Sequence, residues 1–440
     1  MGEPGVNKGF LLFLSCVLLV FVSGCGSSST VILPNGFLYA GNSSRPGSMA
    51  AFSVTTGALG LITGSPFLTT GNAPYTLAAW PPPLPAAAVT TKFLYAGIPA
   101  TQNGGVITRV LHRQLLGSVT GGILLMPIKS DHTLDVPQLF ASGGDYDPIA
   151  ITPNPGNFLY AIDLTANLLV PFSIDTGKGA LTAILQGSMP VGPDPFNVVV
   201  DPQGKFVFVA NCDCFTNPSN KGSVQVFSIN ANGTLNTVGT FVLGGAVTAQ
   251  PIALAISPDS KFLFVASLDN NVYVESIANG SFVDQGSAPL PADSTPVSIA
   301  VSTDGNYVYT GNAGTQNVSF FLNCLQATPP TGCPVGSPPP PLAFPSNNSS
   351  TPVGGTVGVI LTDPTNPPQC TSTTSTNCLP TSVSGFLYVT DYDHGTIQAF
   401  SITSTSACTG VANCIPGTLT QSGTAVNTGG SNPFGLAIAH

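Results

Sequence analysis

The sequence predicts an all-β protein, a seven-bladed β-propeller of four-stranded blades, and three observations carry this prediction. A short aromatic strand recurs seven times, and an apolar segment led by proline recurs close before most copies. No stretch beyond the N-terminal segment has a helical period. Several repeat units are about 45 to 55 residues long, which suits one four-stranded propeller blade.

Each repeat unit supplies four short strands. A proline-led apolar strand comes first, as at residues 195–202 (PFNVVVDP), and the aromatic strand follows it. A strand ending like FSI is third, as at Phe227–Ile229, and a segment opening Gly-x-Leu is fourth, as at Gly233. The aromatic strands begin at Phe37, Phe93, Phe158, Phe206, Phe262, Tyr307 and Phe386.

The two ends of the chain complement each other. Residues 33–40 (LPNGFLYA) resemble the turn and second strand of a unit but have no good first strand before them. Residues 433–439 (PFGLAIA) resemble that first strand alone. We therefore expect the ring to close by pairing the C-terminal strand with the N-terminal blade, which protects both sheet edges.

The composition limits the classes of function. Only 7% of the residues are charged, and the 10 Lys and Arg against 19 Asp and Glu give a net charge of −9. So few cations disfavour nucleic-acid binding. The 49 Gly and 41 Pro indicate many turns between short strands.

The N-terminal segment is typical of export. Lys8 precedes an apolar run from Phe10 to Val22, which is too short for a spanning helix of about 20 residues. The following Ser23-Gly24-Cys25 resembles a bacterial lipobox, and an ordinary signal peptide ending near a cysteine is the alternative. We expect a signal peptide at 1–24, lipidation of Cys25, a flexible tether at 25–30 and the propeller at 31–440, in the bacterial envelope at the outer membrane or cell surface.

A resemblance to a known family follows from the strand endings Val209-Ala210-Asn211, Tyr309-Thr310-Gly311-Asn312 and Tyr388-Val389-Thr390-Asp391. They resemble the YVTN-type repeats that are grouped with the 6-phosphogluconolactonase-like, seven-bladed lactonase propellers. The resemblance implies the fold over nearly the whole mature chain. It implies little about activity, because propellers with this repeat have many roles.

Eight cysteines beyond Cys25 form four close pairs in turns or insertions. In an oxidising compartment, local disulfides are the favoured interpretation, with metal binding and free thiols as alternatives. Insertions are expected at about 324–350 and 364–385. The pairs are Cys212/Cys214, Cys324/Cys333, Cys370/Cys378 and Cys408/Cys414.

Candidate ligand-binding residues gather where second strands end and where one blade leads to the next. In a propeller both places lie on the face that surrounds the channel mouth. Acidic residues outnumber basic ones there, so this rim could bind a divalent cation or a polar, hydroxyl-rich ligand. In tight turns Asp usually bonds its own backbone, which is the competing interpretation. The candidates are Asp145, Asp147, Asp163, Asp194, Asp269, Asp293, Asp391 and Asp393.

Three further residues stand out. Two are candidate catalytic residues, and one departs from the residue type that the repeat has at its position. His394, flanked by carboxylates, could act as a general base, and Arg45 could stabilise an anion. Glu275 falls where other units have Phe227 or Phe400. Burial would raise the pKa of Glu275, but we expect an exposed carboxylate in a locally altered blade.

The lactonases are understood to use His, Glu and Arg at the channel mouth, and here no Glu falls in the predicted mouth loops. We therefore predict a lipid-anchored envelope protein that serves as a binding or interaction scaffold with a ligand site at the channel mouth, with no cofactor and without lactone hydrolysis. Its partner would be an envelope protein, a glycan or a small polar ligand, and the protein is expected to be a monomer. One alternative is a lactonase-type hydrolase with His394 as base and Arg45 as oxyanion partner. Another is a purely structural envelope protein.

Overall fold

The propeller lies within the compact unit Leu33–His440 of a computed structural model. The structure describes residues 36–439 except 45, 56, 71–72, 82–90, 100–120, 141–143, 154–156, 216–220, 244–248, 292–293, 335, 337–339, 346–349, 364–381 and 412–413. The predicted signal peptide, Cys25, Arg45, Asp293, Cys370 and Cys378 lie outside the described residues. No helix in the described part is long and apolar enough to cross a membrane.

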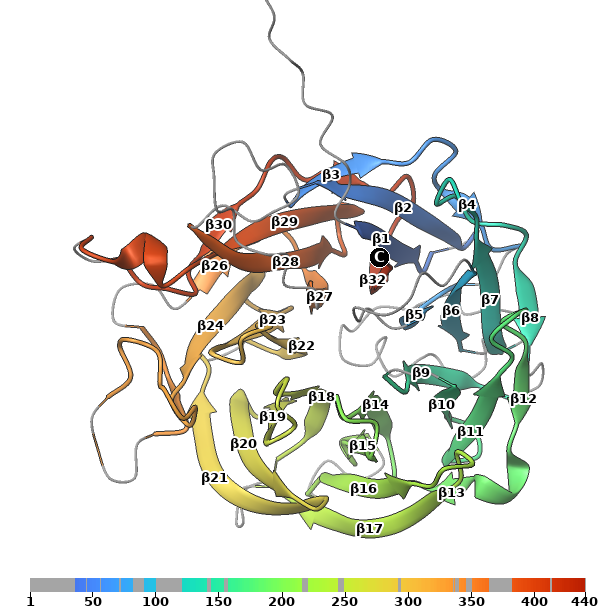
Figure 1. Cartoon of the computed structure of the whole chain (residues 1–440), viewed down its shortest axis with the longest axis horizontal. Coiled ribbons are helices and arrows are strands. Elements are labelled where there is room, and N and C mark those ends of the chain that lie inside the picture. The colour runs from blue at the N-terminus through green and yellow to red at the C-terminus, as the bar shows by residue number, and fades with distance from the viewer. Residues whose placement is uncertain are drawn as a thin grey trace, which may run out of the picture. The chain divides into compact units, whose positions relative to one another are not determined.

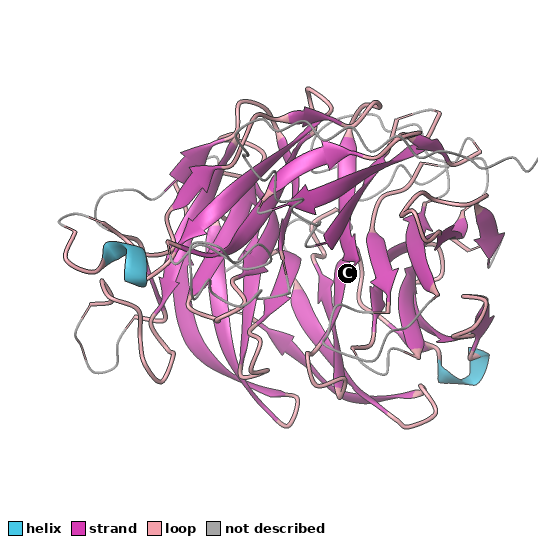
Figure 2. Cartoon of the chain, turned by 45° about the horizontal axis from the view of Figure 1, so that its top comes forward, coloured by secondary structure: helices cyan, strands magenta, loops and turns pink. Residues whose placement is uncertain are grey.

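The described strands form seven antiparallel blades around a ring, which confirms the predicted fold (Figure 1). Blades 2 and 3 are joined into one nine-stranded sheet by the pairing of Ile98 with Tyr146. Apart from two single-turn 3-10 helices, η2 (Leu185–Gly187) and η3 (Ser406–Cys408), the regular structure of these residues is strand (Figure 2).

Blade 1 contains β32 (Pro433–Ala439), β1 (Gly36–Asn42), β2 (Ser48–Thr55), β3 (Ala58–Leu61) and β4 (Phe67–Leu68). Blade 2 contains β5 (Leu77–Trp80), β6 (Lys92–Ile98), β7 (Gly122–Ile128) and β8 (Gln138–Phe140). Blade 3 contains β9 (Tyr146–Ile151), β10 (Phe158–Asp163), β11 (Leu168–Ile174), β12 (Leu181–Ala183) and β13 (Met189–Pro190).

The remaining four blades follow the same order. Blade 4 contains β14 (Pro195–Val200), β15 (Phe206–Asn211), β16 (Ser223–Ile229) and β17 (Leu235–Val242). Blade 5 contains β18 (Pro251–Ile256), β19 (Phe262–Ser267), β20 (Asn271–Ala278) and β21 (Ser281–Pro289). Blade 6 contains β22 (Pro296–Val301), β23 (Tyr307–Asn312), β24 (Asn317–Asn323), β25 (Leu342–Ala343) and β26 (Ser350–Pro352). Blade 7 contains β27 (Val357–Thr362), β28 (Val383–Asp391), β29 (Thr396–Thr403), β30 (Leu419–Gln421) and β31 (Val426–Asn427).

The ring closes as predicted from the two ends of the chain. β32 pairs antiparallel with β1, from Phe37 opposite Ala439 to Gly41 opposite Gly435. All seven residues of β32 are buried. In Figure 1 the red β32 and the blue β1 lie side by side. The last strand of the chain is therefore the inner strand of its first blade.

A repeated contact joins neighbouring blades, and it explains two of the sequence motifs. The glycine that opens the Gly-x-Leu segment has positive φ and lies on the aromatic ring that begins the second strand of the preceding blade. A Cβ on Gly233 (φ 82°) would come within 2.4 Å of the Phe158 ring. The tyrosine two residues further along donates its hydroxyl to the carbonyl of the same glycine, as Tyr160 does to Gly233 at 3.1 Å. The described glycines that lie on such a ring are Gly57, Gly179, Gly233, Gly280 and Gly417, and the tyrosine bond is made to Gly179, Gly233 and Gly417.

Blade 2 makes the same contact with a histidine. His132 has φ 64°, and its ring stacks on Phe37 of blade 1 with centroids 3.3 Å apart. The Tyr39 hydroxyl donates to the His132 carbonyl at 3.1 Å, as it would to the usual glycine. We call the face that carries these contacts the latch face.

Glu275 in β20 is buried, so the expectation of an exposed carboxylate is wrong. The residue is 3% exposed and lies opposite Leu263 of β19 and Asp284 of β21. Burial, and secondarily the charge of Asp284, raise the pKa of Glu275 to about 7. A carboxyl group thus takes a core position that phenylalanine fills in other blades.

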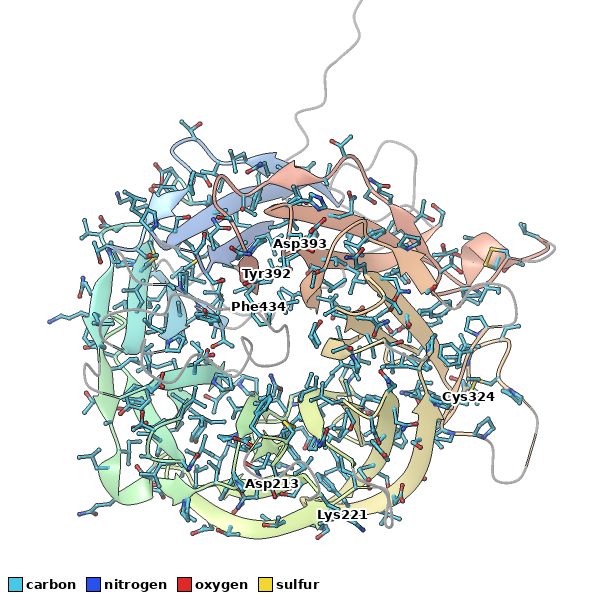
Figure 3. All side chains as sticks on the ribbon, turned by 180° about the vertical axis from the view of Figure 1, so that it is seen from behind. Asp213, Lys221, Cys324, Tyr392, Asp393 and Phe434 are labelled. Carbon is cyan, nitrogen blue, oxygen red and sulfur yellow. A yellow bond between two sulfur atoms is a disulfide. The ribbon has the colours of Figure 1, made fainter. Side chains whose placement is uncertain are left out.

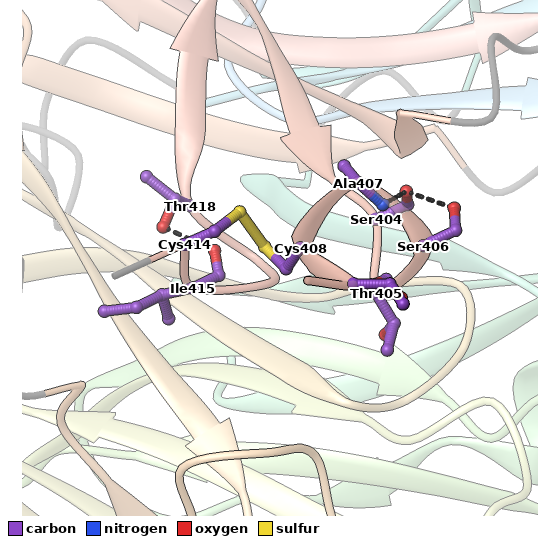
Figure 4. Close-up of a disulfide and its surroundings, with 9 residues drawn as sticks. Ser404, Thr405, Ser406, Ala407, Cys408, Cys414, Ile415 and Thr418 are labelled. Carbon is purple, nitrogen blue, oxygen red and sulfur yellow. Dashed lines mark hydrogen bonds between the residues drawn. A yellow bond between two sulfur atoms is a disulfide. The ribbon is translucent and has the colours of Figure 1, made fainter. Parts of the chain in front are cut away.

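Disulfides form at the three described cysteine pairs, Cys212–Cys214, Cys324–Cys333 and Cys408–Cys414. The last joins η3 to the segment before β30 (Figure 4). Cys324 lies in the turn that follows β24, as expected, and is buried in the core between blades 6 and 7. The segments expected as insertions also contribute strands, namely β25 within 324–350 and the start of β28 within 364–385.

Candidate functional site

The links between blades and the turns between second and third strands lie on the same face of the ring. The register shows this, because the first residue of an inner strand pairs with the last residue of the second strand. Pro195 lies opposite Asn211, Pro296 opposite Asn312, and Val357 opposite Asp391. We call this face the mouth face.

Most polar groups on the mouth face bond within their own turn. Asn211 donates to Gln225 at 3.0 Å, and Asn312 donates to Ser319 at 2.8 Å. Asp163 accepts from the backbone of Thr165 at 3.0 Å. These side chains hold turns in place, as the competing interpretation of the sequence anticipated.

Two more predicted residues also act in turns. Asp194 accepts from the Phe215 amide at 2.8 Å, and Asp269 accepts from the Tyr273 hydroxyl at 2.6 Å. Asp393 is exposed and accepts from the Thr356 hydroxyl at 2.5 Å. No cluster of three or more His, Cys, Asp or Glu that could hold a metal ion occurs among the described residues.

The inner strands of six blades, with Tyr75 and Thr76 just before β5 of blade 2, enclose a central cavity of about 150 Å³. Its lining is largely apolar and includes Phe196, Ile252, Val297, Val359 and Phe434. The lining residues include no lysine, arginine or histidine. The cavity therefore suits a small molecule that carries no net negative charge.

Asp147 is the one carboxylate in this lining. It lies in β9, is 6% exposed, and its Oδ1 accepts from the Thr76 hydroxyl at 2.6 Å and from the Thr76 amide at 3.3 Å. A Cβ on Gly97 would come within 2.7 Å of this Oδ1, so glycine is needed there. Burial raises the pKa of Asp147 to about 7, and the nearby Asp145 carboxylate raises it further while Thr76 opposes the shift. At neutral pH the group is shared between its acid and its carboxylate form.

Two other polar side chains line the cavity. Asn197 of β14 accepts from the Leu254 amide of β18 at 3.2 Å. Ser298 of β22 is 6% exposed, and its hydroxyl has no partner among the described residues. Sequence reasoning missed both, together with Thr76. Thr76, Asn197 and Ser298 each occupy the second position after the leading proline of their unit. Other units have Ala or Gly at this position, and a polar residue there was the sequence signal that could have identified them.

His394 and Asp391 form an ion pair at the rim of blade 7. Their Nδ1 and Oδ2 atoms lie 2.7 Å apart, and Asp391 also accepts from the backbone amides of Asp393 and His394 at 3.1 Å. The Asp391 side chain is 7% exposed and the His394 side chain 63%. The hydrogen bond with Asp391 raises the pKa of His394. A buried carboxylate thus orients an exposed imidazole.

Aromatic residues lie between this ion pair and the cavity. Tyr392, Tyr75 and Phe434 form one buried cluster, and the Tyr75 and Phe434 rings also line the cavity. Figure 3 shows Asp393, Tyr392 and Phe434 in succession from the rim toward the centre of the ring. The ion pair and Asp147 therefore belong to the same face of the molecule.

Comparisons with known proteins agree with this fold. The family model "Lactonase, 7-bladed beta-propeller" matches residues 113–248. A solved Lactobacillus plantarum protein is 15% identical with a TM-score of 0.60, covering 92% of this chain and 99% of its own. A candidate 6-phosphogluconolactonase from Bacteroides fragilis is 17% identical with a TM-score of 0.56, covering 94% and 100%.

A second candidate 6-phosphogluconolactonase, from Bacteroides uniformis, is 15% identical with a TM-score of 0.55, covering 92% and 99%. The search of curated proteins finds no match. At these identities the solved structures establish the fold, and the repeat motifs, the blade topology and the family model agree with one another. The chain therefore has the seven-bladed β-propeller fold, and residues 113–248 match the lactonase propeller model.

Proposed function

We propose that this protein binds a small uncharged molecule, with hydrogen-bonding oxygens, in its central cavity. The observation that carries the proposal is the buried Asp147 carboxyl in an otherwise mostly apolar lining. With Asn197 and Ser298 it provides polar groups from three blades around one space. Such a small set of placed polar groups within apolar walls is typical of ligand sites.

The ligand is expected to be neutral for two reasons. The lining contains no basic residue that could balance a phosphate or carboxylate. Burial also favours the uncharged form of Asp147, whose pKa is raised to about 7. A neutral cyclic polyol or sugar lactone, whose oxygen accepts a proton from the Asp147 acid, fits this chemistry.

Calorimetric titration with a panel of neutral lactones and cyclic polyols, and with their phosphorylated counterparts, tests the proposal. Neutral members should bind roughly tenfold more tightly at pH 6 than at pH 8, because the acid form of Asp147 falls over that range. Asp147→Asn should remove this pH dependence. Asp175→Asn, a change at an exposed turn aspartate, is the matched control. Equal binding by both variants, or preference for phosphorylated members, would refute the proposal.

A second candidate function, hydrolysis of an uncharged lactone, is supported by the His394–Asp391 pair and by the match to the lactonase propeller model. Asp391 holds Nδ1 of the imidazole, so Nε2 would be the atom that activates water. Arg45, the proposed oxyanion partner, lies outside the described residues. The phosphorylated substrate in the names of the two Bacteroides proteins does not suit a lining without cations.

A pH-stat assay of lactone hydrolysis distinguishes this candidate from binding alone. His394→Ala should lower the rate by about 100- to 10,000-fold if His394 is the general base. Because the pKa of His394 is raised, the rate should also increase only at a pH above the ordinary value for histidine of 6.5. His132→Gln, on the latch face, is the control. Turnover that survives His394→Ala would exclude this mechanism.

We also propose that the protein acts at the bacterial envelope, held by a lipid on Cys25. The sequence Ser23-Gly24-Cys25 after an apolar run supports this proposal. Firm retention requires more than one acyl chain. Cys25→Ser should move the protein from the membrane fraction to the soluble fraction after a salt wash, and continued sedimentation with membranes would contradict it.

A further inference from the structure

A disulfide with a single residue between its cysteines lies directly behind the cavity wall. Cys212 and Cys214 follow β15 in the mouth-face turn of blade 4, and they are 0% and 7% exposed. Cys212, Cys214 and Ile252 form one buried cluster, and Phe196 packs against this cluster. Ile252 and Phe196 in turn line the cavity. The bridge is therefore one layer of side chains away from the proposed ligand.

The bridge adds a covalent restraint to a turn that backbone hydrogen bonds also hold. The amides of Cys212 and Asp213 donate to the carbonyls of Asp194 at 2.9 Å and of Pro193 at 3.3 Å. The Cα atoms of Cys212 and Cys214 are 5.0 Å apart, whereas an extended chain would separate them by about 6.6 Å. Opening the bridge removes the covalent restraint, so that the turn can lengthen when these hydrogen bonds open.

Lengthening of this turn would be transmitted to the cavity wall. Phe215, the residue after the bridge, contacts the Phe196 ring at a centroid distance of 5.9 Å, and its amide donates to Asp194. Asp194 directly precedes β14, which carries Phe196 and Asn197. Asn197 then accepts from the Leu254 amide across the cavity wall. A continuous chain of contacts thus joins the bridge to two lining strands.

We propose that the Cys212–Cys214 disulfide is a redox gate of the central cavity, closed when oxidised. This proposal rests on the proposed function only for the identity of the site that it controls. A dithiol reductant supplies two electrons and two protons. The S–S bond breaks, each cysteine becomes a thiol, and the two thiols of the reductant become its disulfide. Phe215 and Phe196 then separate, and the walls formed by β14 and β18 loosen.

The Cys212–Cys214 bridge differs from the other two described bridges in the length of the loop that it closes. Cross-links that enclose longer loops restrain the unfolded chain more, and Cys324–Cys333 and Cys408–Cys414 span nine and six positions. Cys212–Cys214 spans only two. Its opening should therefore alter the cavity wall without unfolding the ring.

The test measures amide hydrogen exchange in the full-length protein during titration with dithiothreitol. Alkylation followed by peptide mass spectrometry identifies which disulfides have been reduced at each step. Alkylation of Cys212 and Cys214 marks the point in the titration at which this bridge has opened. The amides of Phe215 and Leu254 should then exchange at least about tenfold faster, while exchange in blade 7 stays unchanged. The Cys212→Ser/Cys214→Ser variant should show the same pattern without reductant. Cys408→Ser/Cys414→Ser, which removes a bridge remote from the lining residues, should leave both amides protected.

Two results would overturn the gate. Unchanged exchange at Phe215 and Leu254 after reduction of Cys212–Cys214 would show that the bridge does not control the wall. Faster exchange throughout the ring would show that opening the bridge unfolds the protein and does not act on the wall alone. The experiment needs no ligand, so its failure is distinguishable from a failure of the ligand-binding proposal.

Discussion

The two faces of the ring are built by different rules. On the latch face, a positive-φ glycine meets an aromatic ring at one blade junction after another, and a tyrosine hydroxyl bonds the same backbone carbonyl. On the mouth face, the residue before the leading proline is Asp147, Asp194 or Gln250, and each has different partners. The comparison shows that packing between blades imposes the repeat, whereas the mouth face is free to vary.

Removing the closing strand should have the largest effect. Deletion of 433–440 leaves β1 without its inner partner and exposes two sheet edges. We expect aggregation, or loss of the cooperative thermal transition in calorimetry. Deletion of His440 alone, beyond the end of β32, is the control. A deletion protein that melts like the full-length protein would contradict the role of closure.

Substitutions at two glycines separate the contribution of the glycine–aromatic contact to stability from the effect of backbone strain. Gly233 and Gly410 both have positive φ, but a Cβ would meet Phe158 only at Gly233, since nothing lies within 4 Å at Gly410. Gly410→Ala should cost about 1 kcal/mol through the left-handed backbone alone. Gly233→Ala should cost about 3 kcal/mol, because the ring must also move. Equal losses in urea unfolding would mean that the contact contributes nothing.

Glu275 should make stability depend on pH. Its pKa is about 7 in the folded protein against about 4.5 unfolded, so the folded state binds the extra proton. The associated stabilisation is present at low pH and is lost as pH rises from about 4.5 to about 7. Glu275→Gln should stabilise the protein by about 1 to 3 kcal/mol at pH 8 and little at pH 4. Asp147 contributes the same sign, so some dependence should remain in the variant.

Much of the fold could be predicted because the latch repeats in sequence. The aromatic strands and the Gly-x-Leu segments reflect contacts that recur at most blade junctions, and the closing strand reflects its pairing with β1. The burial of Glu275 could not be predicted, since a single departure from a repeat does not reveal whether the side chain stays inside. The cavity was only partly predictable. Asp147 was named among eight acidic candidates, but its pairing with Thr76 joins different blades and has no local signal.

The smallest effect on the free energy of unfolding is expected at the junction of blades 1 and 2, where His132 takes the place of the usual glycine. His132→Gly would restore the residue found at other junctions and remove the strain of φ 64°. It would also lose the ring stacked on Phe37. Each effect is about 1 kcal/mol, so the net change in unfolding free energy should stay within about 1 kcal/mol. A loss well above this value would mean that the stack is the dominant contact at this junction.

The pairing of β1 with β32 also has a consequence for the order of events in folding. β1 is among the first strands to leave the ribosome, and its inner partner is the last. Blade 1 must therefore stay incomplete while the other six are being made, with one edge of β1 open to any strand nearby. Contacts between such distant segments are slow to form. We expect this period to be the one in which the protein most depends on chaperones.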